Sequence, residues 1–273
     1  MAKTLFANFQ RSCYYTNNSP FGSLRAAKVD IDMSTAILLK IQDAIDAVPS
    51  NNKQVHFILV KPGTYREKIV VPADKPFITL SGTKPFDTII TWSEGGEIFN
   101  KFGTSGKAVA VRVSGDKAAF YGCRFLSYQD TLLDDAGKHY FNNCYIEGAT
   151  DFICGNAASL YERCHLHSLS KGNGSITAQK RISPSEKHWF YFLGLQGNRH
   201  WCCFLGRPWG AYLDTVYYGE YKCYGPGADT SKRVQWSHRL SPDEAAPFLT
   251  KDMIGGRGWL RPTPKNFKRP SKL

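Results

Sequence analysis

A short segment that occurs three times restricts the fold of this chain more than any other feature. Residues 120–125 read FYGCRF, and related segments return as FNNCYI at 141–146 and YERCHL at 161–166. The three cysteines lie 21 and then 20 residues apart, each with an aromatic residue three positions before it and an apolar residue two positions after it. Repeats of about 20 to 50 residues are typical of solenoids.

The sequence between the repeats is rich in β-forming residues, is interrupted by Gly and Asn, and contains no long helical stretch. We therefore predict an all-β fold, a parallel β-helix, in which each coil buries its apolar face only by stacking on the next. We expect Cys123, Cys144 and Cys164 to form an interior ladder of small apolar residues. A metal-binding or disulfide role for them is the weaker alternative, and no CxxC pair occurs among the eight cysteines.

The flanking segments differ in character. Residues 34–48 predict an amphipathic helix with Ser34 as N-cap, and a second helix is predicted around 241–249 with Ser241 as N-cap and Pro242 at its first position. Short strands are predicted at 55–60, 68–71, 77–80 and 88–92. We divide the chain into an N-terminal extension (1–33), a β-helix domain (34–262) and a basic C-terminal tail (263–273).

The net charge of +12 over 273 residues favours a polyanionic partner, which could be nucleic acid, anionic lipid or an acidic polysaccharide. The apolar runs are too short to cross a bilayer. The first residues contain no apolar segment of signal-peptide length, and the chain ends in Ser271-Lys272-Leu273, which matches a peroxisomal address.

The repeat aligns two carboxylates. Asp130 lies seven residues after Cys123, and Asp151 lies seven residues after Cys144. Stacked strands are about 4.8 Å apart, so in a β-helix the two acids are neighbours, and one of them ionises more readily than the other. Such a pair suits a nucleophile and an acid/base catalyst. The alternative is two ordinary aspartates in surface turns.

The sequence contains no motif of the other common catalytic systems. The sequence contains no GxSxG, no HExxH and no P-loop, and its seven histidines show no convincing metal-ligand spacing. His165 and His167 would lie on one face of a strand and could bind a metal, but a single HxH is weak evidence, and surface or core histidines are the better interpretation.

Several segments resemble, in order, the signature segments of plant pectin methylesterases (pectinesterases). They are GTYRE at 63–67, QDTL at 129–132, DFICGN at 151–156 and LGRPW at 205–209, with VYYGEY at 216–221 also fitting. The resemblance runs from about residue 30 to about 262. It implies a right-handed parallel β-helix that hydrolyses methyl esters of polygalacturonate to pectate and methanol without metal or cofactor.

The resemblance also implies roles for individual residues. Asp151 would be the nucleophile, and Asp130 would be the general acid and then the base that activates water. Gln129 would donate a hydrogen bond to the oxyanion. Arg207 would hold Asp151 ionised and oriented.

The substrate groove is implied in the same way. Trp209 would offer a flat apolar face to a sugar ring, with Tyr128 and Phe152 lining the same groove. The segment KAVAVR at 107–112 departs from the family, which commonly begins it with Gln as a second oxyanion donor, whereas Lys107 stands here.

The chain also lacks two stretches that the family pattern leads us to expect, one between Asn100 and Lys101 and one between Gly210 and Thr215. We therefore expect a β-helix short of one or two coils. An inactive pectin-binding solenoid is consequently a real alternative to an esterase. A β-helix glycosidase or lyase acting on the same polymer is a further one, and a nucleic-acid binder is the weakest.

By resemblance, the partners are the pectin (homogalacturonan) polysaccharide and a proteinaceous pectinesterase inhibitor, without nucleic acid or membrane, and the chain is expected to be a monomer. The resemblance places the protein in the cell wall, outside the cell. The C-terminal tripeptide leaves the peroxisome as the alternative.

Overall fold

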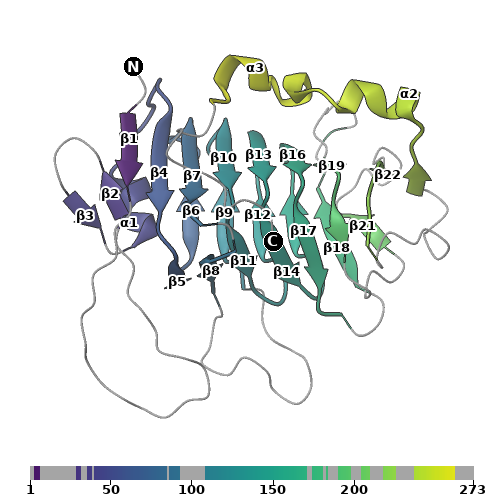
Figure 1. Cartoon of the computed structure of the whole chain (residues 1–273), viewed down its shortest axis with the longest axis horizontal. Helices are drawn as coiled ribbons and strands as arrows, with labels where there is room; N and C mark the ends of the chain where they lie inside the picture. Colours follow the sequence, from purple (N-terminus) through teal and green to yellow (C-terminus); the bar gives the residue numbers. More distant parts are fainter. Residues whose placement is uncertain are drawn as a thin grey trace, which may run out of the picture.

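Three β-sheets run the length of the molecule and make up most of it (Figure 1). Their strands pair in parallel, except at the N-terminal end of one sheet, where two strand pairs are antiparallel. The computed structural model describes residues 3–6, 29–31, 36–38, 40–84, 86–92, 108–170, 174–180, 183, 190–197, 204–209, 218–225 and 237–261. Successive coils add one strand to each sheet, so the predicted right-handed parallel β-helix is confirmed.

Sheet A has nine strands: β1 (Lys3–Phe6), β2 (Val29–Ile31), β3 (Ala36–Leu38), β4 (His56–Val60), β7 (Ile78–Gly82), β10 (Ala118–Tyr121), β13 (Lys138–Asn142), β16 (Ala158–Glu162) and β19 (Phe190–Leu193). Sheet B has six: β5 (Gly63–Arg66), β8 (Thr88–Thr91), β11 (Arg124–Leu126), β14 (Tyr145–Gly148), β17 (His165–Ser168) and β20 (Gln196–Gly197). Sheet C has six: β6 (Ile69–Val71), β9 (Val111–Val113), β12 (Leu132–Asp134), β15 (Ile153–Gly155), β18 (Ser175–Gln179) and β21 (Phe204–Pro208). The strands β22 (Tyr218–Glu220) and β23 (Ser237–Arg239) pair with each other.

The repeated segment builds the interior. Phe120, Phe141 and Tyr161 stack ring on ring, with centroids 5.0 and 4.6 Å apart, and Phe192 continues the ladder at 5.0 Å. The three repeat cysteines are all buried, and their sulfurs contact backbone carbonyls. The predicted interior ladder is therefore confirmed, and each coil buries the side chains of its neighbour.

A left-handed residue stands directly before the inward-pointing position at one corner of each coil. Its φ lies between 51° and 60° in five successive coils, at Gly122, Asn143, Arg163, Gly194 and Lys222. This conformation bends the backbone between sheets A and B. Gly and Asn adopt it at little cost, whereas Arg and Lys do so only because the stacked coils impose it.

The first helix is shorter than the predicted 34–48. The structure has β3 at its start and α1 (Ile41–Asp46) after it, so the N-terminal half of the prediction is wrong and Ser34 does not cap this helix. A distant group caps it instead. The Glu67 carboxylate accepts hydrogen bonds from the backbone N–H groups of Ile41 and Gln42, at 2.9 and 3.1 Å.

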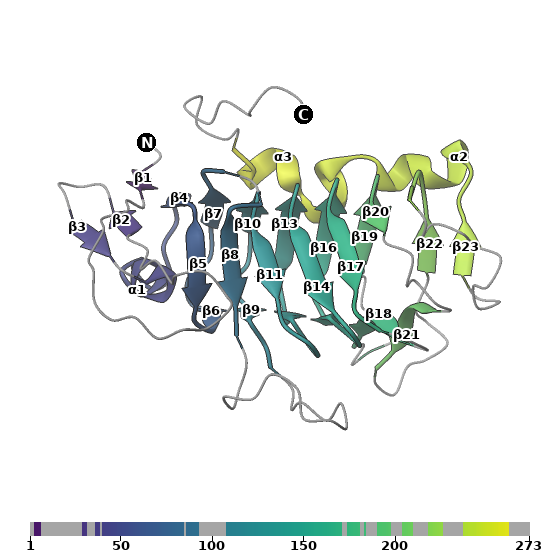
Figure 2. The same ribbon diagram turned by 60° about the horizontal axis from the view of Figure 1, so that its bottom comes forward.

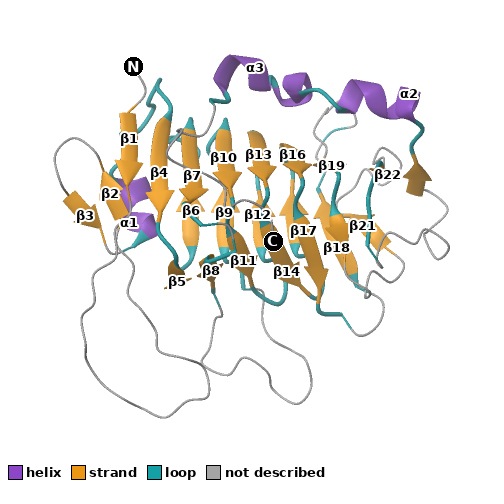
Figure 3. Ribbon diagram, in the orientation of Figure 1, coloured by secondary structure: helices purple, strands orange, loops and turns teal. Residues whose placement is uncertain are grey.

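The C-terminal helical segment covers the outer face of sheet A (Figures 2 and 3). It consists of α2 (Pro242–Ala245), η3 (Ala246–Phe248), η4 (Lys251–Ile254) and α3 (Gly256–Trp259). Ser241 caps it through a capping box with Glu244, as its sequence predicts. Ile254 and Trp259 pack against Tyr140 and Leu160 of the sheet.

Both stretches where coils were expected to be missing, near Asn100 and after Gly210, lie outside the described residues. The strands β8 and β9, which flank residues 93–107 in the sequence, belong to one coil. That coil stacks directly on both of its neighbours, because β8 pairs with β5 and β11, and β9 pairs with β6 and β12. None of the helices in the described part of the chain is long and apolar enough to cross a membrane.

Candidate active site

Asp130 and Asp151 lie in register on neighbouring coils. Gln129 bridges to Thr150 in parallel fashion, Leu132 pairs with Ile153, and the Asp130 N–H donates to the Thr150 carbonyl. The stacking expected from the repeat is therefore confirmed. Both aspartates turn the chain from sheet B to sheet C in the left-handed region, with φ of 55° and 50°. Asp tolerates this conformation better than most residues, and such backbone strain clusters at functional sites.

The Asp151 carboxylate is held from several sides. Arg207 Nε lies 2.9 Å from its Oδ1 and 3.1 Å from its Oδ2, and Arg207 Nη2 donates to Oδ2. The Ser175 hydroxyl donates to Oδ1. The carboxylate is almost buried, at 3% exposure, while half of the Arg207 side chain remains accessible. Charge-assisted bonds of this kind are short and strong, and they fix the orientation of the carboxylate.

The register of sheet C brings these groups together across three coils. Cys154 pairs with Ala178, and Ala178 pairs with Arg207, so strands β15, β18 and β21 lie side by side. The Asp151 N–H also donates to the Ser175 carbonyl at 2.7 Å. Sequence reasoning missed Ser175 because its coil is longer than the earlier ones and carries Leu195 where the repeat has cysteine.

The other residues predicted for the site differ in how exposed they are. Trp209 directly follows β21 and is 41% exposed, which excludes a core role, and the Lys180 ammonium lies 5.7 Å from its ring centroid. Tyr128 and Gln129 are half-buried beside Asp130 in the chain. Lys107 lies outside the described residues.

The expectation that Phe152 lines the substrate groove is wrong. Its side chain is completely buried in the main core cluster. The left-handed turn at Asp151 directs the next residue inward, against Gly148, where any Cβ would collide with the Phe152 side chain. Phe152 therefore supports the turn that carries Asp151 and does not contact a surface ligand.

A third acid near the pair is structural. Asp134, at the end of β12, is completely buried and bonds to His139 Nδ1 at 2.5 Å and to the Tyr161 hydroxyl at 2.7 Å. The other His139 nitrogen lies 3.0 Å from the Gly115 carbonyl. Because both carboxylate oxygens are satisfied inside the core, Asp134 has no access to a substrate. Within the described residues, no group of three or more His, Cys, Asp or Glu side chains could hold a metal ion.

The comparisons with known proteins agree with this geometry. The Pectinesterase family model matches residues 97–216 and 210–257. Putative pectinesterase 11 of Arabidopsis thaliana is 54% identical over 302 residues, covering 89% of this chain and 86% of the relative. The chain belongs to the pectinesterase family. It is therefore an enzyme, a carboxylic ester hydrolase of the pectinesterase type.

Two further pectinesterases support the assignment. Pectinesterase QRT1 of Arabidopsis thaliana is 38% identical over 285 residues, covering 81% of this chain and 75% of the relative. The solved structure of the pectin methylesterase from carrot superposes with a TM-score of 0.66 at 30% identity, covering 89% of this chain and 95% of that one. The alignment with pectinesterase 11 spans 302 residues, more than the 273 of this chain, so that relative carries residues with no counterpart here.

Proposed function

We propose that this pectinesterase removes methyl esters from pectin with Asp151 as nucleophile and Asp130 as acid and base. One observation carries the assignment of roles. The Asp151 carboxylate is bonded to Arg207 and Ser175, and Asp130 lies beside it in register on the preceding coil. An ionised acid next to a second, more accessible acid is the arrangement that covalent ester hydrolysis with acid/base assistance needs.

In the first step, an Asp151 oxygen attacks the carbonyl carbon of the methyl ester. The C–O bond to the methoxy group breaks, and Asp130 supplies the proton that releases methanol. The products are a covalent anhydride between Asp151 and the uronic acid, and an ionised Asp130. Gln129, which precedes Asp130, donates a hydrogen bond to the transient oxyanion, a contribution typically worth about 10²–10³ in rate.

In the second step, the ionised Asp130 takes a proton from water, and the resulting hydroxide attacks the anhydride. The acyl bond to Asp151 breaks, which leaves Asp151 ionised and Asp130 protonated as at the start, and the freed galacturonic acid then loses its proton to the solvent. Arg207 keeps the Asp151 carboxylate in place through both steps. Trp209, two residues after Arg207 in the chain, is exposed and offers its ring to a sugar.

The decisive experiment measures methanol release from highly methylated pectin by the parent chain and by Asp151→Asn. We expect release by the parent and a loss of at least about 10⁴-fold in the variant, because the neutral amide is no longer a nucleophile. Asn favours the left-handed conformation of this position, so the turn is retained. Asp243→Asn is a matched control, because it removes one acid from an exposed helix turn.

Each result has a clear meaning. Equal release by the parent and Asp151→Asn contradicts the nucleophile assignment. No release by a folded parent supports the alternative of an inactive pectin-binding solenoid. New reducing ends without methanol would support a glycosidase, a function that no observation here favours.

We also propose that the enzyme acts in the plant cell wall and that a proteinaceous pectinesterase inhibitor regulates it. The family assignment and the positive charge of the chain support an extracellular acidic polysaccharide as substrate. Immunolocalisation of the full chain tests the compartment, and co-purification with an inhibitor protein tests the partner. Intracellular signal confined to peroxisomes would contradict the cell-wall assignment.

A further inference from the structure

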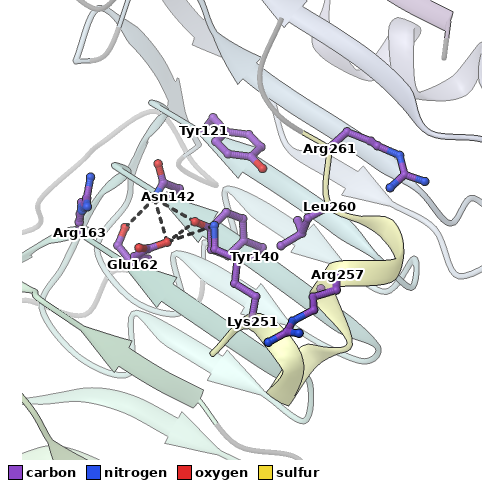
Figure 4. A pocket seen from close by; sticks show the side chains of 10 residues that line it. Tyr121, Tyr140, Asn142, Glu162, Arg163, Lys251, Arg257, Leu260 and Arg261 are labelled. Atoms are coloured by element: carbon purple, nitrogen blue, oxygen red, sulfur yellow. Dashed lines mark hydrogen bonds and ion pairs between the residues drawn. The ribbon is translucent and has the colours of Figure 1, made fainter. Parts of the chain in front are cut away.

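A pocket of about 440 Å³ lies far from the aspartate pair, between sheet A and the C-terminal helical segment. Its sheet side is formed by β10, β13 and β16, and its other side by η4 and α3 (Figure 4). In Figure 2 this helical segment crosses the top of the molecule, whereas β18 and β21, which carry Ser175 and Arg207, lie at the bottom. The pocket is therefore separate from the candidate active site, and its size is that of an ordinary small-ligand site.

The floor of the pocket is polar but already internally bonded. The single carboxylate among its described lining residues, Glu162, accepts a hydrogen bond from the Tyr140 hydroxyl and lies 3.6 Å from the Lys251 ammonium. The same ammonium stands 4.6 Å from the centroid of the Tyr140 ring. Asn142 donates to the Tyr140 oxygen at 3.1 Å. The only negative charge of the pocket is thus neutralised by its own neighbours.

The rim is cationic. Arg163 stands at one end of the pocket, and Arg257 and Arg261 stand on the helical side (Figure 4). Arg257 pairs with Asp252 at 2.7 Å. Within the described part of the chain, the guanidinium groups of Arg163 and Arg261 have no ion-pair or hydrogen-bond partner. The two arginines stand at opposite ends of the pocket, and the Arg261 guanidinium points away from Tyr140 and Glu162, so that it would turn inward to bind an anionic ligand (Figure 4).

The backbone sets the place of Arg163 in the pocket. It occupies the left-handed corner position of its coil, with φ of 55°, where the preceding coil has Asn143. Its side chain is exposed, so the guanidinium reaches solvent at this end of the pocket. Lys222 occupies the same type of corner but does not line the pocket, so the two positions can be compared directly.

We propose that this pocket binds a de-esterified galacturonate segment of pectin, the product of the enzyme's own reaction. The two unpaired arginines would bind uronate carboxylates in bidentate fashion, and the Tyr121 ring beside Tyr140 offers an aromatic surface to a sugar. The proposal rests on pectin as the substrate. A product segment held here raises the local concentration of the remaining esters of the same polymer at the active site.

The test uses a pocket variant, Arg163→Asn combined with Arg261→Gln, in the full chain. Asn suits the left-handed corner, as Asn143 shows one coil earlier. The control is Lys222→Asn combined with Arg239→Gln. It removes the same charge, alters the same type of corner and leaves the pocket lining intact. Equal unfolding temperatures establish that both variants are folded.

Calorimetric titration with a short, fully de-esterified oligogalacturonide gives the result. We expect the affinity to fall about tenfold for each arginine removed in the pocket variant and to stay unchanged in the control. A fully methylated oligomer, which lacks carboxylates, is expected to bind all three proteins equally. Methanol release from that short oligomer is expected to be unaffected.

Three outcomes would overturn the proposal. The first is equal affinity for the de-esterified oligomer in parent and pocket variant. The second is an equal loss in pocket variant and control, which would indicate a general charge effect. The third is a loss confined to a short DNA duplex, which would assign the pocket to nucleic acid. Because binding is measured without turnover, a parent that binds but releases no methanol contradicts the proposed reaction and not the pocket.

Discussion

The Asp151 carboxylate owes its position to two side chains, and only one of them carries charge. Ser175 is 6% exposed and donates its hydroxyl to Oδ1, beside the Arg207 guanidinium. Without the hydroxyl, Arg207 still binds both oxygens of the acid, but Oδ1 loses one of its two donors and is held less firmly. We predict that Ser175→Ala lowers kcat about ten- to hundredfold, as expected for a hydrogen bond to a charged group, with little change in KM.

The conservative variant separates positioning from packing. Ser175→Thr keeps the hydroxyl and is expected to recover most of the kcat, whereas a purely structural serine would make the bulkier Thr the worse of the two. Steady-state methanol release from highly methylated pectin gives both constants. A rise in KM with unchanged kcat would contradict the positioning role.

Residue-level prediction from the sequence succeeded where the repeat is regular and failed where it is not. Asp130 and Asp151 could be aligned because both follow a repeat cysteine by the same interval. Ser175 could not, because its coil departs from the repeat length. Phe152 was misplaced because the inward turn depends on the backbone conformation of Asp151, which no side-chain pattern reveals.

The start of helix α1 is fixed by a side chain that is distant in the sequence. Glu67 follows β5 and caps the first two N–H groups of the helix, 25 and 26 residues away along the chain. An N-cap is predicted from the residues directly before a helix, and a cap supplied from 25 residues away leaves no such local signal. The predicted helix start at Ser34 was wrong for this reason. The same contact gives a structural reason for the Glu of the GTYRE segment.

We predict that Glu67→Ala destabilises the protein by about 1–2 kcal/mol, the usual cost of losing a helix cap, and leaves methanol release per folded molecule unchanged. Asp46→Ala is the matched control, because Asp46 is exposed at the other end of the same helix and its loss is expected to stay within about 0.5 kcal/mol. Denaturant unfolding measures both. Equal effects of the two substitutions would contradict the capping role.

A salt bridge between neighbouring coils, Arg112–Asp135, makes a pH-dependent contribution to stability. Partial burial acts to raise the pKa of Asp135, but the hydrogen bonds from Arg112 and Ser114 outweigh it and hold that pKa below its ordinary value. A lowered pKa means that the contribution is present above the pKa of the unfolded state, about 3.9, and is lost as pH falls through the lower folded value. We predict that Asp135→Asn lowers the melting temperature near neutral pH and that the gap to the parent closes below about pH 4. A gap that persists at the lowest pH would contradict this account.

The positive charge of the whole molecule attracts its polymer substrate only after the reaction has made that polymer negative. Highly methylated pectin is nearly neutral, whereas each turnover adds one carboxylate to the polymer. With a net charge of +12, attraction between the enzyme and the polymer therefore grows during processing. Salt screens such attraction, because the Debye length falls from about 10 Å at 0.1 M to about 3 Å at 1 M.

We therefore predict that added NaCl raises KM strongly for sparsely methylated pectin and only slightly for highly methylated pectin, with kcat little affected in either case. Methanol release measured on both polymers across a salt series checks this. A short methylated oligomer serves as the neutral control, since it carries no block of carboxylates. An equal rise in KM for all three substrates would mean that salt acts on the active site itself, and that the charge of the molecule does not distinguish product-rich polymer from fresh substrate.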